Sequence, residues 1–386
     1  MKEKINLPTL IFIEEGFDWQ IKGNRHYIPL EWSKKTKVIV LTTHQPFLRS
    51  ISQLLLKSGG QKFVENINKN LTIFRPPGLI PFNKTVKLLN NLVDFFWGRI
   101  LLSIFPTAGK MKPIIWLFDP VDYKRISNIA HSLVIYHVVD NYTKSPDTPP
   151  SSIKDDKVLS EKADIIFTSS VYLQEIYRKR NENTFYIGNA SDTEYLIKQL
   201  KKELPVPEDL KSIPQPIAGF IGNMQKYRFD YKLIKYLSER LTDVSFVMVG
   251  PYDKNYTGEI KYPGNVFFLG FKHHKLIPDY LKQFAVLLIP YLTNEFTNAM
   301  LPLKLFDYFT TGKDIVSTNL ETLKPYNNLV YVSHNGKQFE NNILKAFKEN
   351  NKDISRDRIK IGSGSTWLNL IEKSERIIFS LLPHKS

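Results

Sequence analysis

The sequence of 386 residues contains no cysteine, which excludes disulfide bonds and thiolate metal sites and fits a reducing cytoplasm. Its amino-terminal stretch, residues 1–15, has too short an apolar run and no small-residue cleavage site for a signal peptide, and predicts a first strand instead. The chain also lacks internal repeats and low-complexity tracts. His273 and His274 have no partners at metal-ligand spacing, so the sequence predicts no metal site.

The length is too great for one average core and favours two domains. An apolar fraction of 42% with 13% aromatic residues is ample for two buried cores. Segments typical of strands recur with spacers of helical length, the pattern of parallel βαβ units. The predicted strands are Thr9–Ile13, Val38–Leu41, Leu71–Phe74, Ile114–Phe118, Leu133–Val139, Asp164–Ser169 and Thr184–Ile187 in the first half, and Ile217–Ile221, Ser245–Val249, Val266–Leu269, Ala285–Ile289, Asp314–Ser317 and Val330–Val332 in the second.

A segment rich in charge and proline, residues 198–216, separates the two sets of strands and has the composition of a linker. We therefore expect an amino-terminal domain over residues 1–200 and a second domain over 201–364. Residues 365–386 contain a candidate amphipathic helix.

The net charge of +15 is concentrated in part of the first half. Residues 34–112 hold 13 Lys or Arg against two acids, which predicts a cationic surface. Within them, Val86–Phe105 is rich in large apolar residues, but Asn90, Asn91, Asp94 and Arg99 make it a poor membrane span. It is either a buried helix of the first core or a patch that lies on an anionic bilayer.

The most informative segment is PYLTNEFTNAMLPLKLFDYFTTGKDIVST, residues 290–318. It follows an apolar strand, and its apolar residues predict a helix that ends at Gly312. Lys304 and Asp307 are three residues apart and share one face of that helix. They form either an ordinary surface ion pair or a binding site, because ligands of open α/β sheets lie beyond the carboxyl ends of the strands. A lysine suits a phosphate, and a carboxylate suits a ribose diol.

This segment resembles the P-x-K-x-x-E-Y-x-A-x-G-K-P-V-V-S-T motif of nucleotide-sugar glycosyltransferases with the GT-B fold. The resemblance implies two Rossmann-like, doubly wound parallel-sheet domains that face a cleft, with Asp307 at the ribose and Lys304 at the diphosphate or the sugar. The usual Glu is Asp307 here, and the usual Pro after Gly-Lys is Asp314. Retaining members carry a second Glu eight residues before the first, where this chain has Ala299, and Glu295 lies further upstream.

In the first half, IYHVVDNY places His137 and Asp140 at the end of a predicted strand. Transfer of a sugar to a hydroxyl requires a base, and the resemblance implies that inverting members draw it from this region, so Asp140 is the candidate. His137 is assigned to the acceptor or phosphate side, with a core or supporting role as the alternative. Asp119 either supports the same cleft or caps the following helix.

Further candidates follow other strands. Gly16, Trp19, Arg25 and His26 lie in a loop that resembles W-x-x-x-x-x-R-H/P stretches of polysaccharide glycosyltransferases, and are assigned to the acceptor or phosphate side. Arg25 is either a phosphate ligand or a solvated loop residue. GFIGNMQKYRFD, residues 219–230, is not the G-x-G-x-x-G fingerprint, so no NAD is inferred. The donor-side candidates beyond Lys304 and Asp307 are Gly222, Asn223, Lys226, Gly250, Pro251, Tyr291 and Glu295.

Taken together, the residues and the resemblance imply a glycosyltransferase, inverting and metal-independent, that uses a nucleotide sugar, most simply a UDP-sugar, as substrate and needs no cofactor. The expected acceptor is a polysaccharide or a lipid-linked glycan at the cytoplasmic face of the membrane, with peripheral attachment to an anionic surface. A non-catalytic binding or scaffold subunit with the same fold is the alternative. Nucleic-acid binding would rest on the basic charge alone, since no recognised motif supports it.

Overall fold

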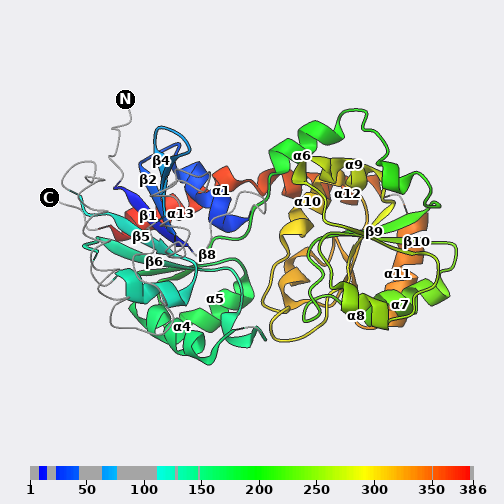
Figure 1. The fold of residues 1–386 in the computed structure, drawn as a ribbon, viewed down its shortest axis with the longest axis horizontal. Coiled ribbons are helices and arrows are strands. Elements are labelled where there is room, and N and C mark those ends of the chain that lie inside the picture. Colours follow the sequence, from blue (N-terminus) through cyan, green and yellow to red (C-terminus); the bar gives the residue numbers. More distant parts are fainter. Residues whose placement is uncertain are drawn as a thin grey trace, which may run out of the picture.

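The computed structural model describes residues 8–14, 23–42, 63–75, 111–126, 129–146, 148–349 and 351–382. Within them the chain forms two α/β domains, each built on one sheet, that lie side by side (Figure 1). Two parallel-sheet domains are the fold that the sequence predicted. The cationic segment 34–112 and the apolar stretch 86–105 fall largely or wholly outside the described residues.

The first sheet has the strand order β3-β4-β2-β1-β5-β6-β7-β8. All its neighbours pair in parallel except the edge strand β3, which is antiparallel to β4. Its strands are β1 Leu10–Glu14, β2 Val38–Thr42, β3 Val64–Asn66, β4 Leu71–Phe74, β5 Ile114–Leu117, β6 Leu133–Val138, β7 Ile165–Thr168 and β8 Thr184–Tyr186.

Alternate residues of these strands enter two cores, one on each face of the sheet, because successive strand side chains point to opposite sides. One face packs against α1, and the other against α4 and α5 (Figure 1). Among the described residues of this half, the helical elements are α1 Asn24–Trp32, η1 Pro120–Ile126, η2 Tyr142–Lys144, α4 Pro150–Lys162 and α5 Val171–Arg178.

The second sheet is parallel throughout, in the order β11-β10-β9-β12-β13-β14. Its strands are β9 Ile217–Ile221, β10 Ser245–Val249, β11 Val266–Gly270, β12 Val286–Ile289, β13 Ile315–Thr318 and β14 Tyr331–Ser333. The helical elements around it are α6 Thr193–Leu200, η3 Glu208–Leu210, α7 Tyr231–Arg240, α8 Lys254–Glu259, η4 His274–Leu276, α9 Ile277–Gln283, α10 Leu303–Thr311, η5 Glu321–Tyr326, α11 Gly336–Lys348 and α12 Lys352–Gly364.

The chain passes between the domains at two adjacent points. The first lies just before α6, whose Leu196 is already part of the second core, so the helix that ends at residue 200 packs on the second domain. The second lies before α13 Trp367–Leu381, which returns to the first sheet and buries Trp367 and Ile371 there (Figure 1). Ser191 and Thr366 form a parallel bridge, which holds the two crossing segments together.

Local sequence explains the helix that carries Lys304. Helix α10 begins after Pro302 and ends at Gly312, whose φ of 68° is the left-handed conformation that glycine adopts without strain. The predicted end of this helix is therefore confirmed. Asp314 follows, and its carboxylate pairs with the buried Arg358 of α12 at 2.6 Å. This ion pair gives Asp314 a structural role where the glycosyltransferase motif has proline.

None of the helices within the described ranges combines the length and the apolar character needed to cross a membrane.

Candidate functional site

Two donor-side candidates, Gly222 and Lys304, follow the carboxyl ends of β9 and β12. These two strands are neighbours in the sheet, yet β10 extends it on one side of β9 and β13 on the far side of β12, so the chain order reverses here. Such a switch point leaves an open crevice that commonly binds ligands. Gly222 follows β9 directly, and Lys304 lies in the first turn of α10, after β12.

Lys304 lies over two aromatic rings of the second domain. Its Nζ is 5.1 Å from the ring centroid of Phe220 and 5.1 Å from that of Tyr291. The ammonium group also donates a hydrogen bond to the Tyr291 hydroxyl. Cation–π contacts and this hydrogen bond hold the charge at one place while leaving it without a carboxylate partner among the described residues. The arrangement presents a fixed positive charge to an anionic ligand.

Gly222 and Gly250 make the space beside this lysine. A Cβ built on Gly222 would lie 2.5 Å from Cε of Lys304, and one on Gly250 would lie 2.0 Å from the carbonyl oxygen of Gly222. Gly250 also has a φ of 136°, which disfavours any side chain. Position 250 therefore requires glycine, a side chain at Gly222 would displace Lys304, and the backbone is bare where a diphosphate would approach it.

Asp307 lies on the same helix as Lys304 but contacts a different partner. Its carboxylate accepts a hydrogen bond from the hydroxyl of Ser191, in the segment that crosses between the domains. Burial raises the pKa of Asp307 to about 6, while the Ser191 hydrogen bond and the charge of Lys304 oppose the rise. The structure therefore does not show the surface ion pair with Lys304 that the spacing allowed, and one carboxylate oxygen is already engaged.

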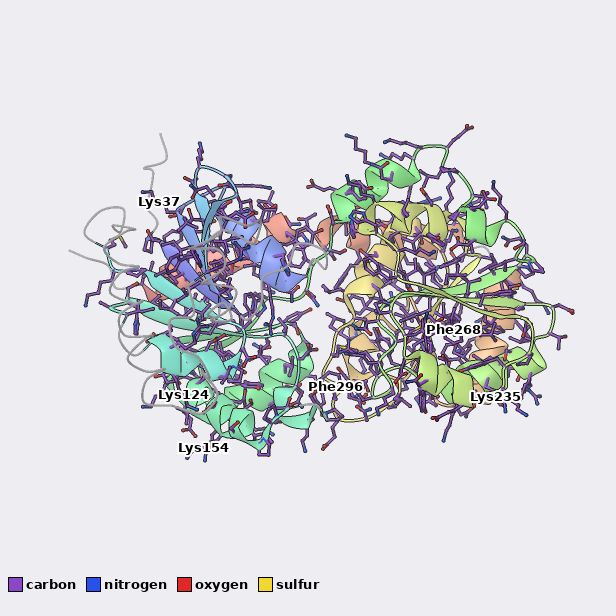
Figure 2. All side chains as sticks on the ribbon, in the orientation of Figure 1. Lys37, Lys124, Lys154, Lys235, Phe268 and Phe296 are labelled. Carbon is purple, nitrogen blue, oxygen red and sulfur yellow. The ribbon has the colours of Figure 1, made fainter. Side chains whose placement is uncertain are left out.

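A pocket of about 290 Å³ lies between the two domains and contains Asp140. Asp140 follows β6 in the first domain and is partly buried. From the second domain, Phe296 reaches the boundary between the two halves (Figure 2). The residues that line this pocket are Asp119, Pro120, Asp140, Ser145, Thr148, Pro149, Ser152, Tyr227, Arg228 and Phe296.

The two carboxylates of this pocket have different surroundings. One oxygen of Asp119 accepts a hydrogen bond from the backbone N–H of Val121 at 3.0 Å, so Asp119 caps η1 as well as lining the pocket. Burial raises the pKa of Asp140, and the guanidinium groups of Arg228 and Arg25 oppose that rise. The raised pKa distinguishes Asp140 from an exposed aspartate.

Sequence analysis missed Arg228 as a partner of Asp140. Arg228 belongs to the loop after β9 in the second domain, and its guanidinium stacks on Tyr227 at 5.3 Å and Phe296 at 5.7 Å from the ring centroids. Nothing in the local pattern relates it to Asp140, 88 positions earlier, because only the packing of the domains brings them together.

The first-domain candidates other than Asp140 differ in burial and in their contacts. His137 is 0% exposed and lies among the rings of Trp116, Phe118 and Phe167, where burial lowers its pKa to about 3. His137 is therefore a core side chain. This burial supports the alternative of a core role and does not support its assignment to the acceptor or phosphate side. Arg25 lies 5.8 Å from the Phe118 ring centroid and acts on Asp140 electrostatically.

His26 accepts a hydrogen bond from the backbone of Gly23 at the start of α1, at 3.4 Å. Gly16 and Trp19 lie outside the described residues.

The remaining donor-side candidates lie around the Lys304 site or at the domain boundary. Tyr291 is 2% exposed and contacts the ammonium group of Lys304 through its ring and hydroxyl. Asn223, Lys226 and Pro251 are exposed. Glu295 is 69% exposed at its side chain and pairs with Lys144 of the first domain at 2.7 Å. Glu295 therefore links the two domains in this arrangement.

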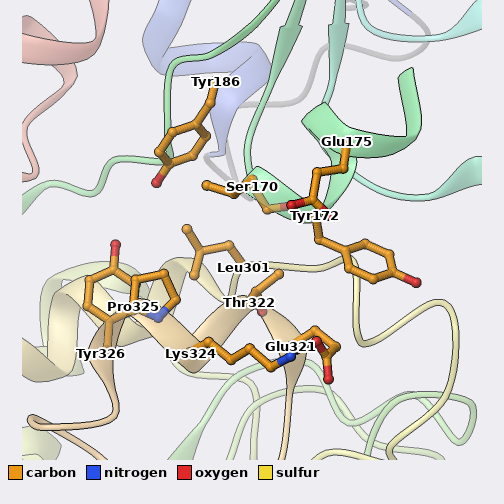
Figure 3. Close-up of a pocket in the computed structure, with 11 residues that line it drawn as sticks. Ser170, Tyr172, Glu175, Tyr186, Leu301, Glu321, Thr322, Lys324, Pro325 and Tyr326 are labelled. Carbon is orange, nitrogen blue, oxygen red and sulfur yellow. Dashed lines mark ion pairs between the residues drawn. The ribbon is translucent and has the colours of Figure 1, made fainter. Parts of the chain in front are cut away.

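Hydrogen bonds between the domains fix the loop that leads into α10. The hydroxyl of Ser170 donates to the carbonyl of Ala299 at 2.9 Å, and the amide of Asn189 donates to that of Leu301 at 3.1 Å. Beside them lies a second interdomain pocket of about 200 Å³, between α5 and η5 (Figure 3). Position 299 is thus a buried alanine packed on the first domain, and it supplies no carboxylate.

Residues 215–349 match the family model of glycosyl transferases group 1, and this range contains Gly222, Lys304 and Asp307. A protein named as a teichuronic acid biosynthesis glycosyltransferase, TuaH of Bacillus subtilis (strain 168), is 30% identical over 179 residues. That match covers 43% of this chain and 44% of the relative, so it spans less than half of either.

Solved structures resemble the chain over nearly its whole length. Sucrose-phosphate synthase from Thermosynechococcus elongatus has a TM-score of 0.69 at 12% identity, over 98% of this chain and 100% of that one. Anabaena HepE in complex with UDP-glucose has a TM-score of 0.65 at 12% identity, over 97% and 100%. The chain has the GT-B fold, and residues 215–349 of its second domain match the glycosyl transferases group 1 model.

Proposed function

We propose that this protein transfers a sugar from a nucleotide sugar, of the UDP type, to a hydroxyl of a glycan or lipid-linked acceptor. The observation that carries the proposal is the fixed charge of Lys304 beside the bare backbone of Gly222 and Gly250, at the switch point of the second sheet. A diphosphate needs both a positive charge and close approach to backbone N–H groups. HepE, which shares the fold, is known in complex with UDP-glucose, and TuaH is named for teichuronic acid biosynthesis.

The proposed mechanism is a single displacement with inversion. The acceptor oxygen forms a bond to the anomeric carbon and gives its proton to the Asp140 carboxylate. The bond from that carbon to the diphosphate oxygen breaks, and its electron pair leaves with the nucleoside diphosphate. Lys304 and the backbone near Gly222 stabilise the charge that develops there, so the proposed reaction requires no metal ion, and turnover in EDTA checks this.

A titration followed by thermal unfolding tests the donor class. UDP and UDP-glucose should raise the midpoint of unfolding, because a ligand at 100 times its dissociation constant adds about 2.7 kcal/mol to the free energy of unfolding. ADP and GDP at the same concentrations are the matched controls. If no nucleoside diphosphate stabilises the protein, the donor site is misassigned, whereas stabilisation without turnover of any UDP-sugar would favour the non-catalytic binding subunit.

We further propose that the protein works at the cytoplasmic face of the membrane as a peripheral protein. The support is the excess of 13 Lys or Arg over two acids in residues 34–112. Each basic residue near an anionic surface contributes about 1 kcal/mol, so a few give weak, reversible attachment. Flotation with phosphatidylglycerol vesicles should show binding at low salt that falls as salt rises, and no flotation at low salt would remove this proposal.

A further inference from the structure

A pocket of about 470 Å³ lies on the first domain, between η1 and α4, away from the donor-side residues. Its volume is within the range of ordinary ligand sites. Lys124 and Lys154, which both line it, lie near one another on the same part of the domain (Figure 2). The lining residues are Pro120, Tyr123, Lys124, Ile126, His131, Lys154, Asp155, Val158 and Lys162.

The charge of this pocket comes mainly from one stripe of α4. Lys154, Val158 and Lys162 are four residues apart in turn, so they share one face, with about 12 Å of helix between the two lysines. Neither of these lysines forms an ion pair with any residue that the structure describes. Asp155, the pocket's acid, is paired with Lys124 at 2.6 Å. The pocket therefore has an uncompensated positive charge at each end of its α4 wall.

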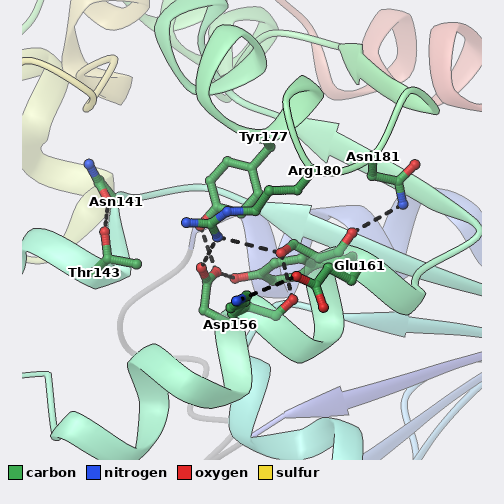
Figure 4. Close-up of polar contacts among 10 residues, drawn as sticks. Asn141, Thr143, Asp156, Glu161, Tyr177, Arg180 and Asn181 are labelled. Carbon is green, nitrogen blue, oxygen red and sulfur yellow. Dashed lines mark hydrogen bonds and ion pairs between the residues drawn. The ribbon is translucent and has the colours of Figure 1, made fainter.

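The α4 wall is held rigidly from behind. Asp156 is fully buried, and its carboxylate accepts hydrogen bonds from the hydroxyls of Tyr136 at 2.7 Å and Tyr177 at 2.6 Å. The same carboxylate forms an ion pair with Arg180 at 2.9 Å (Figure 4). Because these bonds fix the buried face of the helix, the two lysines project from a positioned scaffold. A fixed spacing of charges favours a ligand whose own charges are spaced along its length.

The pocket adjoins the interdomain pocket that contains Asp140. Pro120, the first residue of η1, lines both pockets. Two lining residues are aliphatic, and of these Val158, between the two lysines on α4, is partly exposed and can pack against a sugar ring, whereas Ile126 is buried. An acceptor held in the interdomain pocket can therefore extend past Pro120 toward this pocket.

We propose that this pocket is a subsite for a saccharide acceptor that carries negative charge along its chain, bound through Lys154 and Lys162. The inference rests on the proposed function, since it places the acceptor end at Asp140. It adds the chemical class of the acceptor: sugars with carboxylate or other anionic groups, and not neutral glycans. The same two lysines would hold the chain after the reacting sugar and select it by charge.

Calorimetry with defined oligosaccharides tests the subsite without turnover. Tetragalacturonate should bind the full-length protein at low salt, more weakly as salt rises, and maltotetraose should not bind. The double variant Lys154→Ala/Lys162→Ala should weaken tetragalacturonate binding about tenfold, and Lys154→Arg/Lys162→Arg should retain it. The stabilisation by UDP should be unchanged in both variants, which separates failure of this inference from failure of the donor proposal.

Lys157→Ala is the matched control, because Lys157 is on the same helix, pairs with Glu161 at 4.0 Å and does not line the pocket. Its affinity for tetragalacturonate should equal that of the wild type. The inference is overturned if tetragalacturonate does not bind, or if the double variant binds it as tightly as the wild type. It is overturned too if Lys157→Ala loses as much tetragalacturonate affinity as the double variant loses for each lysine removed. It is also overturned if the double variant loses only binding to phosphatidylglycerol vesicles, which would assign the pocket to lipid headgroups.

Discussion

Replacing Asp140 with Asn should leave UDP-sugar affinity near the wild-type value and lower turnover by about 10²–10⁴-fold, the usual contribution of a positioned base. Asparagine has nearly the same shape but cannot take a proton from the acceptor. Asp140 belongs to the first domain and lines a pocket whose lining does not include Lys304, so donor binding should survive the change. Initial rates with saturating donor, together with a UDP titration, measure the two effects separately.

The pH dependence of turnover gives the same assignment a second test. The base acts only when it is deprotonated, so turnover should fall as the pH drops through the pKa of Asp140. Burial raises that pKa above the ordinary value for an aspartate, so the acidic limb of the profile should lie at a higher pH than an exposed aspartate would give. In Asp140→Asn the small remaining rate should lose this limb.

Asp119→Asn is the control for the pocket itself. Asp119 lines the same pocket, but its carboxylate caps the backbone of Val121, a role that asparagine can also fill. This variant should keep most of the turnover. If Asp140→Asn stays near the wild-type rate, the base is misassigned, and if the product retains the anomeric configuration of the donor, the single displacement is wrong whatever the variants do.

The second half of the protein could be predicted well from its sequence because its signals are local. The strand before Pro290, the helix after Pro302 and the turn at Gly312 each follow from apolar spacing or from a backbone requirement within a few residues. The tight packing of Gly222 against Lys304 is between distant positions, but both follow adjacent strands of a parallel sheet, and the fold implies that they meet.

Contacts between the domains could not be read in this way. The spacing of Lys304 and Asp307 suggested a pair, yet Lys304 turns to Tyr291 while Asp307 accepts from Ser191 of the crossing segment. Arg228 and Asp140 likewise line one pocket only because the domains pack together. Helical spacing shows which residues are neighbours on one face of a helix. It does not show which residue of another domain contacts that face, because this depends on how the two domains pack.

His137 shows the limit of an argument from position at a strand end. It precedes Asp140 by three residues, and either side chain was a candidate for the cleft. Strand side chains alternate, and His137 falls on the face where Trp116 and Phe167 pack, while Asp140 lies beyond the end of the strand. The sequence identifies which residues alternate, but only the packed aromatic rings show that this imidazole is fully buried.

Lys304→Ala should weaken UDP-sugar binding roughly tenfold to a hundredfold, because a hydrogen bond from a charged group contributes about 1.5–3 kcal/mol. Lys304→Met separates charge from packing, since methionine keeps an unbranched apolar stem against Phe220 and Tyr291 without the ammonium group. Calorimetric titration with UDP-glucose should give a similar loss for both variants. Asp307→Ala in the same titration tests the ribose role and should also weaken binding.

Gly222→Ala approaches the same site from the other side and keeps every charge. Its added methyl group would lie 2.5 Å from Cε and 2.7 Å from Nζ of Lys304, and Gly222 has a φ of 157°, so the lysine must move or the backbone must shift. We expect a loss of UDP-glucose affinity at least as large as that of Lys304→Met. The added methyl group would displace the Lys304 ammonium group and would also cover the backbone that the diphosphate approaches. Gly258→Ala is the matched control, since a Cβ there meets nothing within 4 Å, and its affinity should be that of the wild type. If Gly222→Ala and Lys304→Met both bind UDP-glucose normally while the protein still responds to UDP, the diphosphate lies elsewhere in the cleft, and the assignment of this switch point as the donor site is wrong.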